Sequence, residues 1–241
     1  MIKTLAAIRR KPGMAQQEYF SYIRDVHGAL ARAKPLAIRR YVQNHVGDSA
    51  YGADGDPAYQ GLFHRDSVTE LYFDDVEGML RSFTDAYVRD VVGPDGANFS
   101  DMSTALAMLA RDVELVVPAP GDAPVKIMYF LRKPDALTAE RFAEQLRLAV
   151  EAAVGGSPEA ASAVRRAVLT LAIPDETGLM AYFGAKDMPA YDAVVNLWFD
   201  EGGALPAFRA WQKTFLAAGG QPSLHEPSQA FVLVVREVEI I

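Results

Sequence analysis

The amino-acid sequence repeats itself across its midpoint. The segment "IRRKPGMAQQEYFSYI", which begins at residue 8, returns as "FLRKPDALTAERFAEQL" from residue 130. The Lys-Pro pair, the Glu and the Phe of the two copies align at one constant spacing. Later, "ELYFDDVEGMLRSF" at residues 70–83 returns as "NLWFDEGGALPAF" at residues 196–208. A single repeat near half the chain length indicates one duplicated module, because a solenoid needs several short repeats.

A linker separates the two copies. The segment "VPAPGDAP", residues 117–124, contains three prolines and a glycine, which is typical of a connection between folded units. We therefore predict two modules, at residues 1–118 and 124–241.

Hydrophobic periodicity predicts the same elements in each module. In the first, we expect strands at residues 2–9, 36–46, 67–74 and 108–117, a helix that starts near "KPGMAQQ" and ends at Pro35, and a second helix at residues 76–90. This β-α-β-β-α-β order is the ferredoxin-like plan, an α+β fold. Since its sheet has one uncovered face, the two modules are expected to pack sheet against sheet. Residues 47–66 and 93–107 remain outside the pattern and are expected to be binding loops or lids.

Composition excludes several classes of protein. The chain has 241 residues, of which 50% are apolar and 23% charged, as in a globular protein. Its net charge of −7, with no long basic run, argues against nucleic acid as a partner. The absence of cysteine excludes thiolate chemistry and favours a cytoplasmic location. The N-terminal apolar run is too short for a signal peptide or a membrane span, so no membrane partner is expected.

The segment "YIRDVHGALARAKPLAIRRYVQNHV", residues 22–46, contains the strongest candidate for a functional site. His27 lies on the apolar face of the predicted helix, near its C-terminus, where the helix dipole favours the charged imidazole and burial favours the neutral one. His27 is either a packing residue or a general acid/base. Gly28 is expected to allow close packing against a neighbouring element.

Alternation along the following strand places four polar side chains together. We expect one face to carry Arg39, Tyr41, Gln43 and His45, while Ile38, Val42 and Val46 lie under the helices. The polar face is either solvated or offers these groups to an enclosed ligand. On the third strand, Glu70 and Tyr72 share a face and are candidates for binding or protonating a substrate oxygen.

Other catalytic motifs are absent from the sequence. The four histidines show neither HxH nor HExxH spacing, so no metal site is predicted. The glycines do not form a nucleotide-binding loop, and there is no GxSxG element. We therefore predict a protein without a cofactor.

The motifs "RKPG", "RDVHGAL" and "RRYVQNHV" together resemble the EthD family of the dimeric α+β-barrel superfamily. This resemblance implies a barrel formed by two ferredoxin-like halves, here joined covalently. It also implies relatives among cofactor-free cyclases, decarboxylases, dehydratases, dehalogenating enzymes and small monooxygenases that act on phenolic or polyketide-like rings. The second half lacks the histidine motif, because Ala149 stands at the position spaced like His27.

Three functions are compatible with this sequence. The first is a cofactor-free lyase, isomerase or cyclase (a dehydratase or decarboxylase, for example) for a small aromatic or polyketide-like substrate; its catalytic residues would be His27, Tyr41 and Tyr72, and its binding residues Arg39, Gln43, His45 and Glu70. The second is a non-catalytic carrier of a small ligand, accessory to an oxygenase or a degradation pathway. The third is a haem enzyme, since a tandem barrel also resembles the chlorite-dismutase and dye-peroxidase branches; those ligate iron from the C-terminal half, where His225 is the only histidine.

The asymmetry between the halves predicts one functional pocket per chain, in or beside the first half. Further association of the fused barrel into a homodimer is left open.

Overall fold

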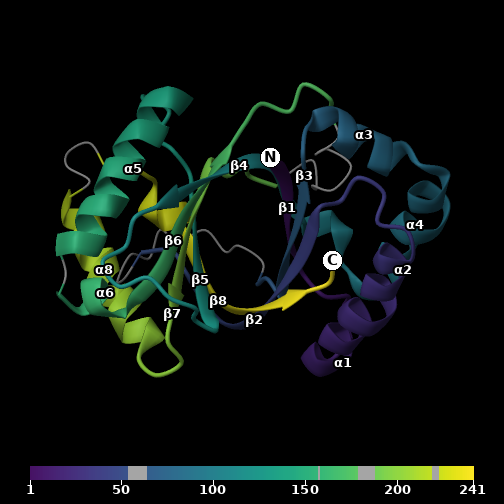
Figure 1. Ribbon diagram of the computed structural model, residues 1–241, viewed down its shortest axis with the longest axis horizontal. Helices are drawn as coiled ribbons and strands as arrows, with labels where there is room; N and C mark the ends of the chain where they lie inside the picture. Colours follow the sequence, from purple (N-terminus) through teal and green to yellow (C-terminus); the bar gives the residue numbers. More distant parts are fainter. Residues whose placement is uncertain (54–63, 157, 179–187, 219–222) are drawn as a thin grey trace.

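The chain folds into a closed antiparallel barrel with helices on two opposite sides (Figure 1). The structure is a computed structural model, and it describes residues 1–53, 64–156, 158–178, 188–218 and 223–241. Within these residues the barrel strands are β1 (Ile2–Ile8), β2 (Arg40–Tyr51), β3 (Ser67–Phe73), β4 (Leu106–Leu115), β5 (Val125–Leu131), β6 (Val164–Ala172), β7 (Ala193–Phe199) and β8 (Phe231–Glu239).

The strands of the two halves pair in the same order. The first half pairs as β4-β1-β3-β2 and the second as β8-β5-β7-β6. Hydrogen bonds between β2 and β8, and between β4 and β6, join the two sheets into one barrel. The predicted mixed α+β barrel is confirmed at this level. The sheets meet edge to edge rather than only face to face, because this pairing satisfies the backbone groups that each open sheet edge would expose.

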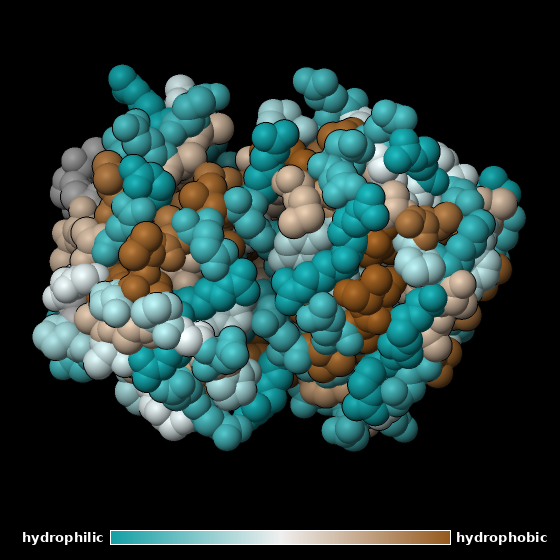
Figure 2. All heavy atoms as spheres, in the orientation of Figure 1, coloured by the Kyte–Doolittle hydropathy of each residue, from teal (hydrophilic) through white to brown (hydrophobic). Residues whose placement is uncertain are grey.

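Two groups of helices cover the barrel. The first half supplies α1 (Gln16–Ser21), η1 (Tyr22–His27), α2 (Gly28–Ala33), α3 (Val76–Thr84), η2 (Val88–Val92), α4 (Gly93–Phe99) and the short η3 (Met102–Thr104). The second half supplies α5 (Ala139–Gly156), α6 (Pro158–Ala163), α8 (Ala204–Ala218) and the short η4 (Pro227–Gln229). Each group lies against its own half of the barrel (Figure 1). The surface seen in Figure 2 is mainly hydrophilic, with separate apolar patches on both lobes.

Two expectations about the first half were wrong. The helix predicted at residues 76–90 ends at Thr84 and is followed by the π-helical turn η2. Residues 93–107, expected as a loop, contain α4, which starts at Gly93-Pro94. Proline suits the first turn of a helix because its missing N–H has no partner there. Of the other predicted loop, β2 occupies residues up to Tyr51, and residues 54–63 lie outside the described part of the chain.

Successive residues of each strand face opposite sides of the barrel wall. In β1, Leu5 and Ala7 belong to an apolar cluster inside the barrel, whereas Thr4, Ala6 and Ile8 line a space under the helices. Both faces of the strand are therefore enclosed, one by the opposite barrel wall and the other by helices.

Candidate functional site

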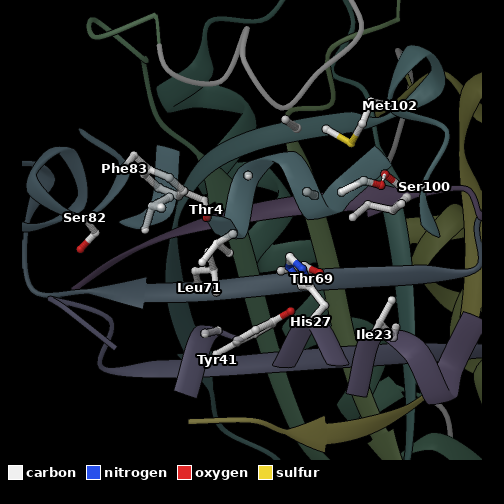
Figure 3. A pocket seen from close by; sticks show the side chains of 18 of the residues that line it. Thr4, Ile23, His27, Tyr41, Thr69, Leu71, Ser82, Phe83, Ser100 and Met102 are labelled. Atoms are coloured by element: carbon white, nitrogen blue, oxygen red, sulfur yellow. Dashed lines mark hydrogen bonds between the residues drawn. The ribbon is translucent and has the colours of Figure 1, made fainter. Parts of the chain in front are cut away.

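A cavity of about 660 Å³ lies between the helices of the first half and the outer face of β1, β2 and β3. Its volume is in the range of small-molecule binding sites. Most of its walls are apolar, formed by residues that include Ile23, Ala31, Ile38, Leu71, Phe73, Phe83, Val88, Val92, Phe99 and Met102. Its polar lining includes Thr4, Tyr19, His27, Tyr41, Ser67 and Thr69. Figure 3 shows His27, Tyr41 and Thr69 directed toward one part of this cavity.

His27, which lines the cavity, forms a pair with Asp95. Nδ1 of His27, at the end of η1, lies 2.9 Å from Oδ2 of Asp95 in α4. Oδ1 of Asp95 accepts hydrogen bonds from the Tyr22 hydroxyl (2.7 Å) and from Nδ2 of Asn98 (2.9 Å). The His27 ring packs against Phe99, with 4.8 Å between ring centroids. The imidazole is therefore fixed by a carboxylate that is itself held in place.

The hydrogen-bond partners define the protonation of this pair. Burial lowers the pKa of His27 below its ordinary value, and Asp95 only partly offsets this effect. Burial favours the neutral form of Asp95, but hydrogen bonds from Tyr22, Asn98 and His27 together lower its pKa. At neutral pH a neutral imidazole thus faces a carboxylate, which can only accept. Nδ1 therefore carries the proton, and Nε2 presents a free electron pair to the cavity.

A π-helical turn positions His27. In η1 the Gly28 N–H donates to the carbonyl of Ile23, five residues earlier; such turns often occur at functional sites. A Cβ atom at Gly28 would lie 3.2 Å from the Ile23 oxygen and 3.2 Å from Cδ1 of Ile240, near the C-terminus. The prediction that Gly28 allows close packing is confirmed, and this contact fixes the helix immediately after His27.

Tyr41, Gln43 and His45 form a hydrogen-bonded row on β2 beneath η1. Nε2 of Gln43 donates to the Tyr41 hydroxyl (2.9 Å) and to the Ile23 carbonyl (2.6 Å), while its Oε1 lies 3.2 Å from Nε2 of His45. Since an amide nitrogen only donates, the Tyr41 hydroxyl accepts from Gln43 and keeps its own proton for another acceptor. That acceptor is Thr69, which is within hydrogen-bond reach, or an oxygen atom of a ligand.

This row faces the helices, so the face assignment made from the sequence was wrong. Gln43 contacts η1, and the His45 ring stacks on Phe20 at 4.4 Å between centroids. Val46 belongs instead to the apolar cluster inside the barrel. The alternation itself was predicted correctly, but its direction was reversed because both faces of β2 are buried.

Glu70 and Tyr72 lie on the opposite side of the sheet from this cavity, inside the barrel. Glu70 bridges two buried lysines, with 2.5 Å to Lys3 and 2.6 Å to Lys126. Burial would raise the pKa of Glu70, but the two lysines hold it well below its usual range. The Tyr72 hydroxyl lies 3.4 Å from both Glu70 and Asp112. Glu70 and Tyr72 therefore belong to a charged network of hydrogen bonds and ion pairs that is separate from His27 and Tyr41.

Arg39 also lies apart from the cavity. Its side chain is 60% exposed and forms an ion pair with Asp74 at 2.5 Å. In contrast, Asp95, Tyr22 and Thr69 were missed by sequence reasoning. Asp95 lies in "GPDGANF", whose glycines and proline are typical of a loop, and no local spacing connects it with His27.

The surroundings of His225 do not fit a haem ligand. His225 is 2% exposed, its Nε2 lies 2.9 Å from the Tyr129 hydroxyl, and its ring packs against Phe215. Trp211 stacks on Phe215 at 5.0 Å and fills the adjacent space. Nε2 of His225 is therefore occupied by Tyr129 within an aromatic cluster. Among the described residues, no three His, Cys, Asp or Glu side chains form a cluster suited to a metal ion.

Comparisons with known proteins agree with this architecture. Barrel and cavity together define the chain as a member of the α+β-barrel class. Residues 11–103 match the EthD domain, so the resemblance noted in the sequence is confirmed and the first half of the chain is EthD-like. No curated protein sequence matches the chain. None of the helices in the described ranges has the length and apolar character required to cross a membrane.

Solved structures share the fold at low sequence identity. An anthrone oxidase-like protein is 9% identical, with a TM-score of 0.55, and the match covers 98% of this chain and 91% of that one. A protein of Fusobacterium nucleatum subsp. nucleatum, provisionally assigned as a monooxygenase, is 9% identical, with a TM-score of 0.53 and coverages of 98% and 91%. A chlorite dismutase variant from Candidatus Nitrospira defluvii is 11% identical, with a TM-score of 0.51 and coverages of 97% and 90%. At these identities the likeness concerns the fold alone.

Proposed function

We propose that this protein is a cofactor-independent enzyme of the lyase or isomerase type, which moves a proton on a small aromatic or polyketide-like substrate. One observation carries the proposal. Nε2 of His27, kept unprotonated by the hydrogen bond from Nδ1 to Asp95, opens into an apolar cavity that also receives the Tyr41 hydroxyl. A tuned base and a fixed donor in a dry pocket are sufficient for such chemistry.

The proposed reaction begins with a C–H group beside a substrate carbonyl. Its proton passes to Nε2 of His27, and the electron pair moves onto the carbonyl oxygen. Asp95 stabilises the imidazolium that forms, as the carboxylate of a catalytic triad does. Return of the proton to a different atom completes an isomerisation. Attack of the enolate carbon on a second carbonyl, whose oxygen takes the proton from His27, completes a ring closure. Loss of a β-hydroxyl as water, with the proton from His27, completes a dehydration, and none of these steps requires an oxidant. The apolar walls limit competition by water.

Tyr41 acts in this proposal as a hydrogen-bond donor to the developing oxyanion. Burial raises the pKa of Tyr41 to about 12, so the phenol stays protonated at neutral pH. Gln43 fixes the direction of the hydroxyl by donating to it. A preorganised donor of this kind typically contributes 10²–10³-fold in rate, or roughly 3–4 kcal/mol. Tyr72, which contacts Glu70 and Asp112 inside the barrel, has no part in this step.

Exchange of substrate protons for deuterium tests the proposal without knowledge of the product. A panel of phenolic and polycyclic ketones in D₂O is incubated with protein, and exchange is followed by NMR. The wild type should accelerate exchange for at least one compound. His27→Gln should lower that rate by about 10²–10⁴-fold, and Tyr41→Phe should lower it less. His64→Gln, at a histidine that is 48% exposed, is the matched control and should leave the rate unchanged.

The same experiment separates the alternatives. Binding of a compound without exchange, at equal affinity in wild type and His27→Gln, would support the carrier function instead. Oxygen uptake that depends on His27 would indicate that the deprotonated substrate reacts with O₂, in line with the names of two fold relatives. A visible absorption band in the purified protein would contradict a cofactor-independent enzyme.

We further propose that residues 1–118 and 124–241 are tandem ferredoxin-like modules, the second of which serves as a scaffold. The identical pairing order of the two sets of four strands supports this. Residues 1–118 expressed alone would expose the barrel-facing side of their sheet and should dimerise or aggregate. A monomeric first half with a cooperative melting transition would contradict the proposal.

A further inference from the structure

Arg65 is a buried cation with unused hydrogen-bond donors. It lies two residues before the start of β3, and it is only 2% exposed. Its Nη1 donates to the carbonyl of Thr104 and, at 3.5 Å, to that of Ala7. Nε and Nη2 have no partner among the described residues. Buried polar atoms without a partner are rare in proteins and call for an explanation, such as a water molecule or an ion.

Among the described residues no carboxylate forms an ion pair with Arg65, although Asp101 favours its charge without contacting it. The adjacent carboxylate, Asp66, forms an ion pair with Arg10, and Asp101 lies 3.6 Å from Arg9. Burial lowers the pKa of Arg65, which means that its surroundings oppose the positive charge. An isolated buried ion is strongly destabilising, so a negatively charged group is the missing complement.

The unused edge has a specific geometry. Nε and Nη2 form one side of the planar guanidinium, and this side matches the two oxygens of a carboxylate or phosphate in a bidentate contact. We propose that Arg65 binds a small oxyanion, a carboxylate or a phosphate, through Nε and Nη2.

Arg65 lies beside aromatic residues of the barrel interior. The Arg65 backbone N–H donates to the Tyr51 hydroxyl at 2.9 Å, and the Tyr51 ring stacks on Phe231 inside the barrel. Tyr191, whose hydroxyl donates to the Gln229 carbonyl, packs edge to face on the same phenylalanine. The edge is covered in this structure, so an anion enters by local displacement of these surroundings. The site is separate from the His27 cavity, and its test does not depend on the proposed function.

Anion-dependent thermal stability of the full chain tests this site. Melting temperatures are measured with sodium acetate, sodium phosphate or sodium chloride at constant ionic strength. A ligand that binds the native state alone stabilises it by mass action, so acetate, phosphate or both should raise the melting temperature in a saturable way, and chloride should not. A response to acetate alone assigns an organic carboxylate, and a response to phosphate alone assigns a phosphate group.

Variants of Arg65 show whether the response belongs to this side chain. Arg65→Met should abolish it and, without added anion, should be at least as stable as wild type, because it removes an uncompensated buried charge. Arg65→Lys, which keeps the charge but lacks the two parallel N–H donors of the guanidinium, should bind the anion at least tenfold more weakly. Arg111→Met, at an exposed arginine on β4, is the matched control and should respond as wild type does. The absence of a saturable response in wild type, or its persistence in Arg65→Met, would overturn the proposal.

Discussion

The two helix-covered faces of the barrel differ in what lies between sheet and helices. In the first half this space is the cavity that contains His27. In the second half it is filled by aromatic rings, since Tyr129 makes edge contacts with Phe208, Trp211 and Phe215. When strands are equated by pairing order, Tyr129 stands where the first half has Ala6, a residue that lines the cavity. Side-chain volume at one strand position therefore accounts for part of the difference.

Polarity differs between the same two faces. The helix-facing positions of the first half carry Thr4, Tyr41, Gln43, His45, Ser67 and Thr69, and the strand register places Ile127, Ala167, Leu169, Leu171, Ala193 and Val195 at the equivalent positions. A cavity lined only by apolar groups can hold a ligand, but it cannot transfer a proton. The first half combines space with polar groups at these positions, whereas the second half carries apolar side chains at the equivalent ones.

The barrel interior, in contrast, is nearly alike in the two halves. Lys3 of the first half is equivalent to Lys126 of the second, and Tyr72 is equivalent to Trp198, because each lysine is the cross-strand partner of that aromatic residue. Lys126 lies over the Trp198 ring at 4.9 Å, much as Lys3 lies over the Tyr72 ring at 5.2 Å. Glu70 breaks this correspondence, because Asn196 occupies its equivalent position. One carboxylate can bridge both lysines, and a second one would bury an extra negative charge. The residues that the two halves share thus lie in the barrel interior, where the halves meet, and the residues that differ line the candidate site.

The largest effect is expected at Asp95. Asp95→Asn can donate to Nδ1 of His27, which would move the imidazole proton to Nε2 and remove the base. By analogy with carboxylates that orient catalytic histidines, we expect a loss of about 10²–10⁴-fold in deuterium exchange with little change in ligand affinity. Asp101→Asn is the control, because Asp101 lies outside the cavity and pairs with Arg9. Full activity of Asp95→Asn would show that the pair is structural.

Exchanging the side chains of the equivalent residues Tyr129 and Ala6 should lower the stability of the protein in one variant and abolish ligand binding in the other. Tyr129→Ala removes a buried ring and leaves Nε2 of His225 without its partner, so unfolding by urea should show a loss of about 3–5 kcal/mol. Ala6→Tyr places a ring in existing space, so it should cost less than this while abolishing ligand binding. If Ala6→Tyr still binds ligand at wild-type affinity, the cavity is not the binding site.

Exchanging a polar for an apolar side chain at the equivalent positions Thr69 and Val195 should have a smaller effect on stability and on ligand binding. Val195→Thr introduces a hydroxyl into a fully buried apolar cluster and should destabilise the protein by about 1–3 kcal/mol. Thr69→Val should leave stability nearly unchanged and weaken ligand binding, because Thr69 lines the cavity. Urea unfolding and ligand titration of both variants check this pair. Equal effects on the two measurements in both variants would mean that the faces do not differ in role.

A further effect concerns acid stability. Burial lowers the pKa of His225 from 6.5 to about 4. Below pH 6.5 the unfolded chain therefore binds a proton that the folded chain does not accept until about pH 4, so stability is complete above pH 6.5 and falls between these values. His225→Gln should reduce that slope in urea unfolding between pH 7 and pH 4, and His64→Gln should not. An unchanged slope in His225→Gln would contradict a depressed pKa.

The repeat and the periodicities act over long stretches, so they predicted the order of strands and helices, and the resemblance to the EthD family implied the barrel. The "RDVHGAL" motif and the alternation through Tyr41 and His45 also predicted which side chains would lie together on β2. Periodicity could not indicate which face of β2 meets the helices. That inference needs a contrast between a buried and a solvated face, and β2 is enclosed on both.

Asp95 could not be predicted for a different reason. Its partner His27 lies 68 residues away in the sequence, and contact between them depends on how the two helical arms fold over the sheet. "GPDG" is typical of a turn, and only the helical segment before it, η2, determines that these residues start α4. Glu70 illustrates the same limit, because its role follows from Lys126 in the other half of the chain.

The protonation of His27 tests the central claim most directly. Two-dimensional ¹H–¹⁵N NMR of histidine side chains distinguishes the two neutral tautomers, and the His27→Gln variant assigns the signal. We expect His27 at pH 7 to be neutral with its proton on Nδ1, and its pKa to lie below the ordinary histidine value of 6.5. In Asp95→Asn the proton should move to Nε2. A doubly protonated ring at pH 7, or a neutral ring with its proton on Nε2 in the wild type, would contradict the account.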